Sequence, residues 1–549
     1  MKFLIQASNS QNQQMKPQNQ FMNPWKFLPG ILFAASLILF SCKPTHRGQA
    51  VNGNALRTEA FRPQFHFSPD SMWMNDPNGM VYYKGEYHLF YQHHPFSNIW
   101  GPMHWGHAVS RDLIHWETLP VALYPDSLGT IFSGSAVIDW NNTSGLGSRR
   151  NPPMVAIFTH YNQQLERVSS NQFQYQSLAY SLDRGRTWTK YQGNPVVQNP
   201  GIRDFRDPKV SWYEEGQKWI MVFAAGDRIL FYSSPNLIDW HKESEFSAPR
   251  AANEGVWECP DFFSLESGNE KKWVLLVSIG AGGPQGGSGT KYYIGDFDGS
   301  RFTCDDPSGR SRWLDQGKDN YAGVTWSDIP SDDGRRIFMG WMSNWQYAMS
   351  VPTYRWRSAM TLPRELRLVK DQDGFILTSV PVEETRELRS VRKRLEPGPV
   401  EDGSSVGPEL KGGYPLFEID LTFEFNPRET DDTKFGIILE NSQNEQLLLI
   451  YDASSQYVII DRNQSGITGF SQYFPGIHYA YYQPQEEGVI RFHIFVDLSS
   501  AELFVDRGDL VMTDLCFPEK EYGTISLYSK GGSVNLKQGD IYLLKRIWK

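Results

Sequence analysis

Cysteine is scarce in this sequence, with four residues among 549. Cys42 ends an apolar run near the N-terminus, and the other three, Cys259, Cys304 and Cys516, lie far apart. Three scattered cysteines make no disulfide framework and lack the spacing of a metal site. We therefore expect a fold that is stabilised by packing, and we expect no metal.

Basic residues are outnumbered as well. Residues 1–42 hold three lysines and no acidic residue, so the rest of the chain has 50 basic against 62 acidic residues, a net charge of −12. A protein with this balance does not attract a phosphate backbone, which needs clustered Lys and Arg. We therefore expect no nucleic acid partner.

Long apolar runs are missing, apart from a mostly apolar run of 14 residues, 27–40, that follows Lys26. It is too short to span a bilayer comfortably. It leads into Leu39-Phe40-Ser41-Cys42, which resembles the lipobox of a bacterial lipoprotein signal, where the cysteine is lipidated and becomes the first residue. We interpret residues 1–42 as a lipoprotein signal peptide and Cys42 as its lipidation site. An ordinary signal peptide and a membrane anchor are the alternatives.

Lipid on Cys42 would tether the protein to a membrane without a transmembrane helix. The expected location is the bacterial cell envelope, with the protein lipid-anchored at the periplasmic or the surface face of the outer membrane. The membrane would be a partner only through this lipid. Residues 43–60 are polar, and we interpret them as a flexible tether.

The sequence also lacks a convincing amphipathic helix. From about Phe61 onward it consists of short alternating runs, such as residues 80–83, 87–92 and 219–224, which are separated by Gly, Pro, Asn and Asp. This pattern indicates an all-β fold. Aromatic residues are abundant instead, at 14% with 18 Trp and 26 Tyr, which suits β cores and flat surfaces on which ligands stack.

A weak repeat appears three times, at residues 110–116, 181–188 and 234–240. Each copy starts with Ser, continues through polar turn residues and ends in Trp. The tryptophans are spaced near the length of one four-stranded propeller blade. We expect these turns to close hairpins and the tryptophans to pack between blades. Residues 61–385 are therefore predicted to form a β-propeller.

The pattern changes near residues 386–412, where a run of charges meets Pro397, Gly398 and Pro399. We interpret this segment as a connector, or as the first turns of a second domain. Residues 413–549 show longer, cleanly alternating strands, which are typical of a β-sandwich. No cluster of acidic residues stands out there, so we predict a supporting role for this domain.

Three carboxylates have similar settings. Asp76 lies in Asn-Asp-Pro-Asn-Gly, Asp207 in Arg-Asp-Pro, and Glu258 in Trp-Glu-Cys-Pro. The proline and Asn-Gly after Asp76 predict a rigid turn rather than a place in a strand ladder. A local cap in a turn is the simpler interpretation of such an Asp. If the repeats are blades, however, the three carboxylates come from different blades and can meet at one central funnel, which suits glycoside hydrolysis.

The surroundings of each carboxylate suggest its role. One carboxylate must be ionised to attack the anomeric carbon, and another must be protonated to donate to the leaving oxygen. Glu258, between Trp257 and Cys259, has the more apolar setting, which favours the protonated form. Asp76 has amide donors beside it in Asn75 and Asn78. Asp207 is expected to stay charged next to Arg206, and to hold sugar hydroxyls or stabilise positive charge.

Two other patterns suggest sites and are set aside. His93, His94, His104 and His107 lack the helical spacing of a metal site, so we expect hydrogen bonds within the rim of the site or the core. The Gly-rich residues 282–289 are not followed by a helix or by Gly-Lys-Ser/Thr, which excludes a phosphate-binding loop. We predict a conformationally special loop near the pocket.

Four motifs, in this order, resemble those of glycoside hydrolase family 32, the β-fructosidases, which include invertases, inulinases and levanases. They are residues 73–79, Phe132-Ser133-Gly134-Ser135, Arg206-Asp207-Pro208 and Glu258-Cys259-Pro260. The likeness continues through residues 340–347 and 352–366, and more loosely to the end of the chain. Residues 315–326 and 282–289 resemble exo-acting fructan hydrolases more than dedicated invertases.

The resemblance implies a five-bladed β-propeller joined to a C-terminal β-sandwich, and a retaining double displacement. Asp76 would be the nucleophile, Glu258 the acid/base and Asp207 the stabiliser of the transition state. The residues that would line the fructose pocket are Asn75, Gln92, Trp100, Phe132, Ser133 and Arg206, with Trp341 and Trp345 as further candidates. Packing in a turn or a β core is the alternative role for each of them.

The sequence therefore predicts an exo-acting glycoside hydrolase that releases fructose from the non-reducing ends of levan or inulin, with sucrose as a further substrate. Water is expected to suffice as co-substrate, without a cofactor. The alternatives are an invertase or a fructosyltransferase of the same family, or a non-catalytic surface glycan-binding protein. A propeller hydrolase of arabinose-type sugars should lack residues 73–79 and the Glu258-Cys259 motif.

Overall fold

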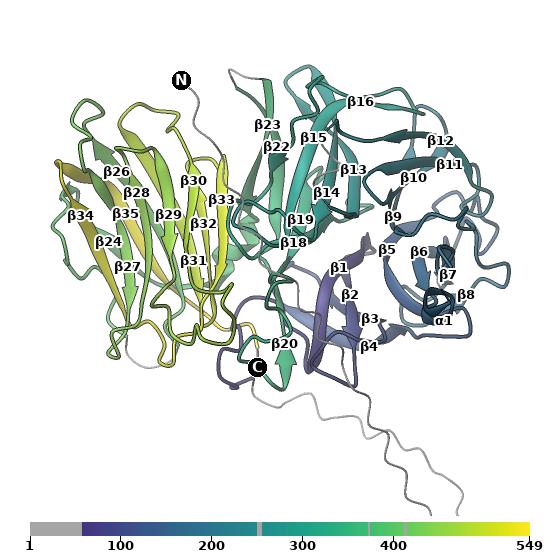
Figure 1. Ribbon diagram of the computed structural model, residues 1–549, viewed down its shortest axis with the longest axis horizontal. Helices are drawn as coiled ribbons and strands as arrows, with labels where there is room; N and C mark the ends of the chain where they lie inside the picture. The colour runs from purple at the N-terminus through teal and green to yellow at the C-terminus, as the bar shows by residue number, and fades with distance from the viewer. Residues whose placement is uncertain (1–56, 169, 250–254, 372–373, 411–413, 549) are drawn as a thin grey trace, which may run out of the picture. The chain divides into compact units, whose positions relative to one another are not determined.

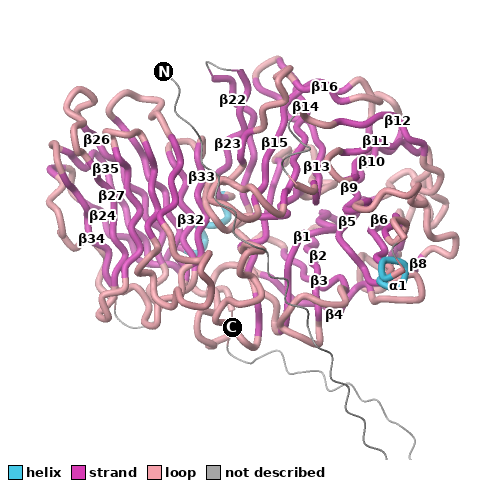
Figure 2. The backbone as a smooth tube through the Cα atoms, viewed as in Figure 1, coloured by secondary structure: helices cyan, strands magenta, loops and turns pink. Residues whose placement is uncertain are grey.

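The computed structural model describes residues 57–168, 170–249, 255–371, 374–410 and 414–548. In these residues the regular structure is almost entirely strand, and the helices are the short α1 (Gln163–Arg167) and the 3₁₀-helix η2 (Glu383–Leu388) (Figure 2). The predicted all-β class is confirmed. The predicted signal peptide, Cys42 and most of the predicted tether lie outside the described residues. None of the described helices is long and apolar enough to cross a membrane.

The N-terminal part of the fold begins with three antiparallel sheets. The first contains β1 (Met72–Tyr83), β2 (Glu86–His94), β3 (His104–Ser110) and β4 (Trp116–Leu123), with β20 (Trp356–Arg357) added parallel to β1. The second contains β5 (Thr130–Ile138), β6 (Met154–Tyr161), β7 (Gln174–Ser181) and β8 (Thr189–Lys190). The third contains β9 (Phe205–Tyr213), β10 (Lys218–Ala225), β11 (Ile229–Ser234) and β12 (His241–Phe246).

Two more sheets complete this part. The fourth contains β13 (Trp257–Ser267), β14 (Glu270–Ile279), β15 (Gly289–Phe297), β16 (Phe302–Cys304) and β17 (Arg312–Trp313). The fifth contains β18 (Tyr321–Thr325), β19 (Arg336–Met342), β21 (Ala359–Met360), β22 (Arg364–Asp371) and β23 (Gly374–Pro381).

The first strands of the five sheets form a closed ring. Strand β1 contacts β5, β5 contacts β9, β9 contacts β13, β13 contacts β18, and β18 contacts β1 (Figure 1). Apolar side chains fill the space between successive sheets; Val137 and Val155 of the second sheet, for example, share a core with Val210 and Met221 of the third. This is the predicted β-propeller. Its five sheets agree with the predicted number of blades, which stays a prediction.

The three sequence repeats adopt one local geometry. In each repeat the indole N–H donates to the carbonyl oxygen three residues earlier: Trp116 to Leu113 at 3.1 Å, Trp188 to Gly185 at 3.1 Å, and Trp240 to Leu237 at 2.9 Å. Each turn joins the third strand of a sheet to the fourth. All three rings pack against the core clusters of the propeller. The predicted packing role of these tryptophans is therefore confirmed.

The C-terminal part is the predicted β-sandwich. One sheet contains β24 (Arg389–Leu395), β25 (Gly398–Pro399), β26 (Phe417–Phe425), β31 (Val489–Asp497), β32 (Ser500–Val505), β33 (Leu510–Leu515) and β35 (Val534–Leu544). The other contains β27 (Lys434–Glu440), β28 (Gln446–Asp452), β29 (Tyr457–Asp461), β30 (Ile477–Tyr481) and β34 (Thr524–Lys530). Their alternating inward residues form a single apolar core.

The segment predicted as a connector, residues 386–412, contributes to the sandwich. Residues 389–395 of this segment form β24, which pairs antiparallel with β35, and Gly398 pairs with Leu536. Four of the charges that suggested a linker lie in this edge strand and are exposed or half-buried, at Arg389, Arg392, Lys393 and Arg394. Two of them are neutralised there, because Arg389 pairs with Glu418 and Arg392 with Asp540.

Buried charges join the sandwich to the propeller. Arg364 of β22 donates to Asp315 at 2.9 Å and to Glu502 of β32 at 3.0 Å. Arg462 donates to Asp319 at 2.6 Å. All of these side chains are fully buried, so removing one partner would leave an uncompensated charge. Glu502 and Arg462 of the sandwich thus hold the two parts together through Arg364 and Asp319 of the propeller, which agrees with its predicted supporting role.

Folding stability should depend on pH through His66, which lies in this interface. Burial lowers its pKa, but Asp497 at Nδ1 and Glu502 at Nε2, both at 2.8 Å, outweigh burial and raise the pKa from 6.5 to about 9. The resulting stability is fully present below pH 6.5 and is lost as the pH rises through about 9. Its size is up to about 3 kcal/mol, because a tenfold change in proton affinity corresponds to about 1.4 kcal/mol.

The His66→Gln variant should therefore be less stable than the unchanged protein at pH 6, and its stability should depend less on pH between 6.5 and 9. Urea unfolding at a series of pH values measures both effects. His115→Gln, at an exposed histidine that pairs with Asp112 in a surface turn, is the control. Equal pH dependence in the His66 variant and the unchanged protein would contradict the assignment.

Candidate active site

The first strands of the five propeller sheets share one irregularity. In each sheet, two residues of the first strand face one residue of the second, which makes a β-bulge. The bulges are Asn75–Asp76 opposite Gln92, Phe132–Ser133 opposite Thr159, Asp207–Pro208 opposite Phe223, Cys259–Pro260 opposite Val277, and Ala322–Gly323 opposite Gly340. A bulge leaves a residue unpaired and redirects its side chain. Each inner strand thus has a β-bulge at about the same level of the propeller.

These bulges correct one expectation from the sequence. Residues 73–79 are not a turn but lie inside β1. Pro77 pairs with Tyr91 directly after the bulge, and Pro208 and Pro260 lie inside bulges of their own. Proline has no N–H, and a sheet tolerates it where a ladder hydrogen bond is already missing. The proline after each carboxylate therefore marks a bulge, which the sequence pattern alone does not separate from a turn.

The inner strands enclose a cavity of about 290 Å³. It is lined by Asn75, Asp76, Gln92, Trp100, Phe132, Ser133, Tyr161, Glu166, Phe173, Gln174, Arg203, Asp204, Arg206, Asp207, Glu258 and Trp345. The structure thus brings together all three predicted carboxylates and every predicted pocket residue except Trp341. Trp341 is fully buried and packs between Trp73 and Trp345, so its predicted place in the pocket is corrected to a place behind the wall.

The carboxylate of Asp76 is held by several donors. Asn75 Nδ2 donates to Oδ1 at 2.9 Å and Ser133 Oγ donates to Oδ2 at 2.7 Å, while Cys259 Sγ lies 3.4 Å from Oδ2. Burial raises the pKa of Asp76, and the hydrogen bonds from Ser133 and Asn75 oppose that rise. The Asn78 amide does not donate to the carboxylate of Asp76 as expected. It donates instead to the backbone carbonyl of Asp76, at 3.4 Å.

Asp207 has a strained backbone and a buried carboxylate. Its φ of 64° lies in the left-handed region, and its N–H donates to Thr159 Oγ1 at 3.0 Å. The carboxylate accepts a hydrogen bond from the Cys259 N–H at 3.0 Å. Burial raises the pKa of Asp207 to about 7 and outweighs the opposing effect of Arg206, whose Nε lies 3.8 Å away. Arg206 thus offsets only part of the effect of burial, and the charged state of Asp207 stays a prediction.

Glu258 has a polar setting, not the apolar one that its neighbours in sequence suggested. Arg206 Nη2 donates to its Oε1 at 2.8 Å, and the Tyr321 hydroxyl donates to its Oε2. Trp257 is fully buried in the core between the third and fourth sheets. Side chains alternate along a strand, so Trp257 faces away from the cavity, whereas Cys259, which lies in the bulge, faces Asp76 and Asp207.

Three further residues, which were not predicted from the sequence, position this cluster. Tyr321, directly before the bulge of β18, contacts Glu258. It lies within residues 315–326, which resemble exo-acting fructan hydrolases, but no role was predicted for it. Asp204 accepts from Arg206 Nη1 at 2.6 Å and lies only two residues from it, a spacing that could have suggested the contact. Gln174 accepts from the Phe205 N–H at 2.8 Å, and nothing in the sequence connects these two positions.

The Gly-rich loop supports one wall of the cavity. The Trp345 N–H donates to Ser288 Oγ at 3.2 Å, and the Trp345 ring stacks on Trp73 with centroids 5.9 Å apart. Gly287 has a φ of 75°, and a Cβ there would lie 2.2 Å from Asn344 Oδ1. Only glycine fits this approach without displacing Asn344. The loop therefore lies beside the pocket, as expected from the sequence.

The four histidines make local hydrogen bonds, as expected. Their partners are Trp73 O for His93 at 2.7 Å, Ile99 O for His94 at 3.0 Å, Pro102 O for His104 at 3.0 Å, and His88 for His107 at 3.0 Å. No group of three or more His, Cys, Asp or Glu residues suited to a metal ion occurs in the part of the chain that the structure describes.

Comparison with known protein families agrees with this geometry. The model of the glycosyl hydrolases family 32 N-terminal domain matches residues 66–379, and that of the family 32 C-terminal domain matches residues 383–542. The chain belongs to glycosyl hydrolase family 32. It is 48% identical to the levanase of Bacillus subtilis over 494 residues, which cover 89% of this chain and 71% of the levanase. It is 39% identical to the extracellular exo-inulinase of Aspergillus awamori, with 89% and 96% covered.

Solved structures give the same result. The exo-inulinase of Aspergillus awamori matches with a TM-score of 0.81 at 37% identity, covering 90% of this chain and all of that one. The β-fructofuranosidase of Schwanniomyces occidentalis, complexed with fructosyl-erythritol, matches with a TM-score of 0.79 at 32% identity, covering 89% and 99%. This family 32 glycoside hydrolase therefore has the propeller and sandwich architecture of its relatives.

The hydrogen bond from Ser133 should set the acid limb of the pH profile of this glycosidase. Ser133→Ala removes a donor that lowers the pKa of Asp76, so the pKa should rise further and the acid limb of kcat/KM should move to higher pH. At neutral pH the loss should be about 10-fold, as is usual for a hydrogen bond to a charged group. Ser133→Thr, which keeps the hydroxyl, should restore the profile. An unmoved acid limb in Ser133→Ala would contradict this role.

Proposed function

We propose that this protein is a retaining, exo-acting β-fructosidase that releases fructose from the non-reducing ends of levan or inulin, with sucrose as a further substrate. The observation that carries the proposal is the meeting of Asp76, Asp207 and Glu258 in one cavity of about 290 Å³. This volume is at the small end for ligand sites and suits one terminal sugar unit. The relatives named levanase and exo-inulinase support the choice of fructans.

Each carboxylate has a role in the proposed reaction. Asp76 attacks the anomeric carbon and forms a covalent fructosyl-enzyme, while Glu258 gives a proton to the departing glycosidic oxygen. Glu258 then takes a proton from the water that attacks the intermediate, so that Asp76 is released. Asp207 and Arg206 hold the sugar hydroxyls. The donors on Asp76 and the contacts on Glu258 orient the two groups before substrate binds.

The alternatives differ in the fate of the covalent intermediate or in whether it forms at all. A fructosyltransferase would pass the fructosyl group of the same intermediate to a sugar hydroxyl. An invertase would prefer sucrose to fructans. A non-catalytic glycan-binding protein would not need Asp76, Asp207 and Glu258 together with their hydrogen-bonding partners, so the intact cluster argues against it.

Product analysis tests the proposal. The protein is incubated separately with levan, inulin and sucrose, and the products are resolved by chromatography over time. Free fructose should be the first and main product from at least one fructan. A ladder of oligosaccharides would overturn exo action, transfer products would favour the fructosyltransferase, and release from sucrose alone would favour the invertase. No cleavage of any substrate would leave only glycan binding.

We also propose that the mature protein is held at the bacterial cell envelope by lipid on Cys42, as the apolar run of residues 27–40 before it suggests. The Cys42→Ala variant should be recovered in the soluble fraction of cells that retain the unchanged protein in their membranes, because one lost lipidation site removes the anchor. Cys304→Ala, at a cysteine in the propeller, is the control. Continued membrane association of the Cys42 variant would point to another anchor.

A further inference from the structure

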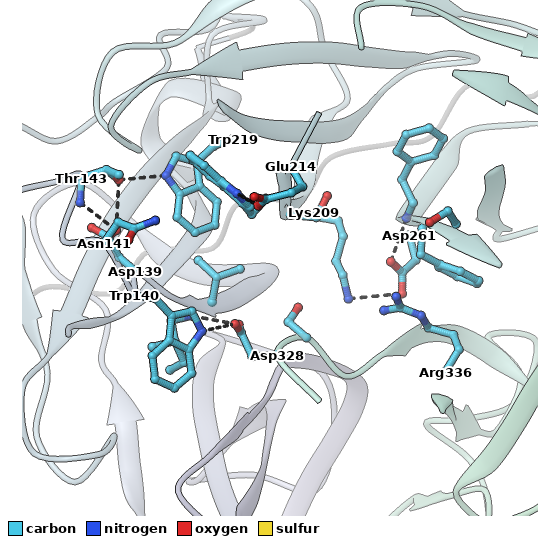
Figure 3. Close-up of a pocket in the computed structure, with 18 of the residues that line it drawn as sticks. Asp139, Trp140, Asn141, Thr143, Lys209, Glu214, Trp219, Asp261, Asp328 and Arg336 are labelled. Carbon is cyan, nitrogen blue, oxygen red and sulfur yellow. Dashed lines mark hydrogen bonds and ion pairs between the residues drawn. The ribbon is translucent and has the colours of Figure 1, made fainter. Parts of the chain in front are cut away.

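A second cavity, of about 450 Å³, lies farther along the same inner strands (Figure 3). Three of the inner strands line the catalytic cavity first and the second cavity later: Ser133 then Ile138 in β5, Asp207 then Ser211 in β9, and Glu258 then Ser264 in β13. A strand advances about 3.3 Å per residue, so the second cavity begins roughly 7 to 10 Å along the strands from the carboxylates, at Lys209 and Asp261, and reaches Ser264 at roughly 20 Å from Glu258. The two cavities share no lining residue, so the second cavity is separate from the proposed site of cleavage.

Tryptophans in the wall of this cavity are fixed by their indole N–H groups. Trp140 donates to Asp328 at 2.8 Å, Trp212 to Glu214 at 2.6 Å, and Trp219 to Thr143 at 2.9 Å. Two of these bonds, from Trp140 and Trp219, are drawn in Figure 3. Trp140 is 52% exposed although its ring is held and packs at an angle against Tyr83, with centroids 5.6 Å apart, so part of the ring is available to a ligand. Rings held in this way lose little side-chain freedom when a ligand stacks on them.

The two cations of the cavity differ in how far they are engaged. Lys209 Nζ lies 3.2 Å from Asp261 and donates to the Thr325 carbonyl at 2.5 Å, so it is paired. Arg336 makes a single hydrogen bond within the described part of the chain, to the Trp326 carbonyl at 3.4 Å. A guanidinium carries five N–H donors. Figure 3 shows the Arg336 side chain reaching toward Asp261 and Lys209. Its guanidinium packs over the ring of Phe263, 4.8 Å from the centroid, and its other donors can serve a ligand in the cavity that it lines.

The charges of the wall exclude charged ligands. Four carboxylates line the cavity, Asp139, Glu214, Asp261 and Asp328, against the two cations, so an anion is not attracted. The carboxylates are engaged as well: Asp139 accepts from the N–H groups of Thr143 and Ser144, both at 2.8 Å, and Asp328 accepts from the Ile138 N–H at 2.9 Å. They are therefore not free to bind a cation.

A purely apolar ligand is excluded by the same wall, because it would leave the donors of Arg336 buried and unpaired. The remaining class is a neutral molecule that offers hydroxyl groups to Arg336 and C–H faces to the indoles of Trp140 and Trp212. Carbohydrates have this combination of surfaces.

We propose that this cavity is a second carbohydrate-binding site, which holds a neutral fructan segment while the chain end occupies the catalytic cavity of the same or a neighbouring molecule. The choice of a fructan as the carbohydrate rests on the proposed function. Such a site keeps the enzyme on its polymer between cleavages. It lowers KM for fructans relative to KM for sucrose, which is too short to use both cavities.

Titration calorimetry of the full chain tests the proposal. In a protein inactivated by Asp76→Asn and Glu258→Gln, a short inulin-type oligosaccharide should show two binding events. Adding Trp140→Ala should weaken one of them about 10-fold, the upper range for the loss of one stacked aromatic ring. In the active protein the same change should raise KM for levan or inulin relative to KM for sucrose.

Two further variants make the result decisive. Ser264→Phe adds bulk to the cavity wall without removing a side-chain hydrogen bond, and should abolish the same binding event. Tyr473→Ala removes an aromatic ring of the sandwich that is 50% exposed, and should leave both events unchanged. A single binding event, or a second event that neither cavity variant alters, would overturn the second site. Failure of the proposed function would appear differently, as an absence of fructose release by the unchanged protein.

Discussion

Replacing Asp76 by Asn should lower kcat/KM for fructose release by about 10⁴-fold or more, because the proposed nucleophile is lost. The change should reduce kcat itself, since no covalent intermediate forms. Asn has the same shape as Asp, so the fold should be kept. The two donors that face the carboxylate, from Ser133 and Asn75, would then meet an amide, which can accept from one of them.

The loss must be the same for all substrates if Asp76 is the nucleophile. Initial rates with levan, inulin and sucrose measure it, and thermal unfolding checks the fold. Asp204→Asn is the matched control, because this carboxylate also lines the cavity but contacts Arg206 and not the reacting centre. That variant should lose about 10-fold, the usual cost of one hydrogen bond to a charged group. Rates of Asp76→Asn within 10-fold of the unchanged protein would show that another group attacks.

The convergence of the three carboxylates could be predicted from the sequence because two patterns agreed. The repeats that end in Trp116, Trp188 and Trp240 indicated blades, and Asp76, Asp207 and Glu258 had similar settings in different blades. A propeller then leaves one place for them to meet. The strand content and the order of propeller and sandwich could be predicted on the same basis, from alternating patterns that local physics determines.

The bulges could not be predicted in the same way. Asp-Pro and Asn-Gly indicate a turn by local preference, and the structure keeps these residues inside β1 because a closed ring of strands holds them there. Tertiary contacts override local preference where a site needs it. The polar setting of Glu258 has the same origin, since Arg206 and Tyr321 reach it from β9 and β18.

The residue pairs across the interface between propeller and sandwich could not be predicted from the sequence either. His66 forms hydrogen bonds with Asp497 and Glu502, which lie more than 400 positions later in the sequence. Arg364 forms one with Glu502, which lies 138 positions later. The alternation of residues along β32 and β33 predicts which side chains face inward. It does not predict which cation of the other domain they pair with. Charges that looked scattered in the sequence are therefore partners in the fold.

Glu258→Gln should separate acid catalysis from nucleophilic attack. With fructans, kcat/KM should fall by about 10² to 10⁴-fold, the range for loss of a general acid. With an aryl fructoside whose leaving group needs no proton, the first step should be nearly unaffected, and the covalent intermediate should accumulate because no base activates water. Asp76→Asn should lose activity equally with both substrates.

Tyr321→Phe is the matched control for this variant, because it removes only the hydroxyl that donates to Glu258 and keeps the ring. Its loss should be about 10-fold and should depend on pH, since one contact of the acid/base is gone while the carboxyl group remains. Single-turnover kinetics with the aryl fructoside distinguish the two variants. An equal loss of Glu258→Gln on fructan and aryl fructoside would mean that Glu258 binds the sugar without donating a proton, and the acid would have to be sought at Asp207, whose pKa burial raises to about 7.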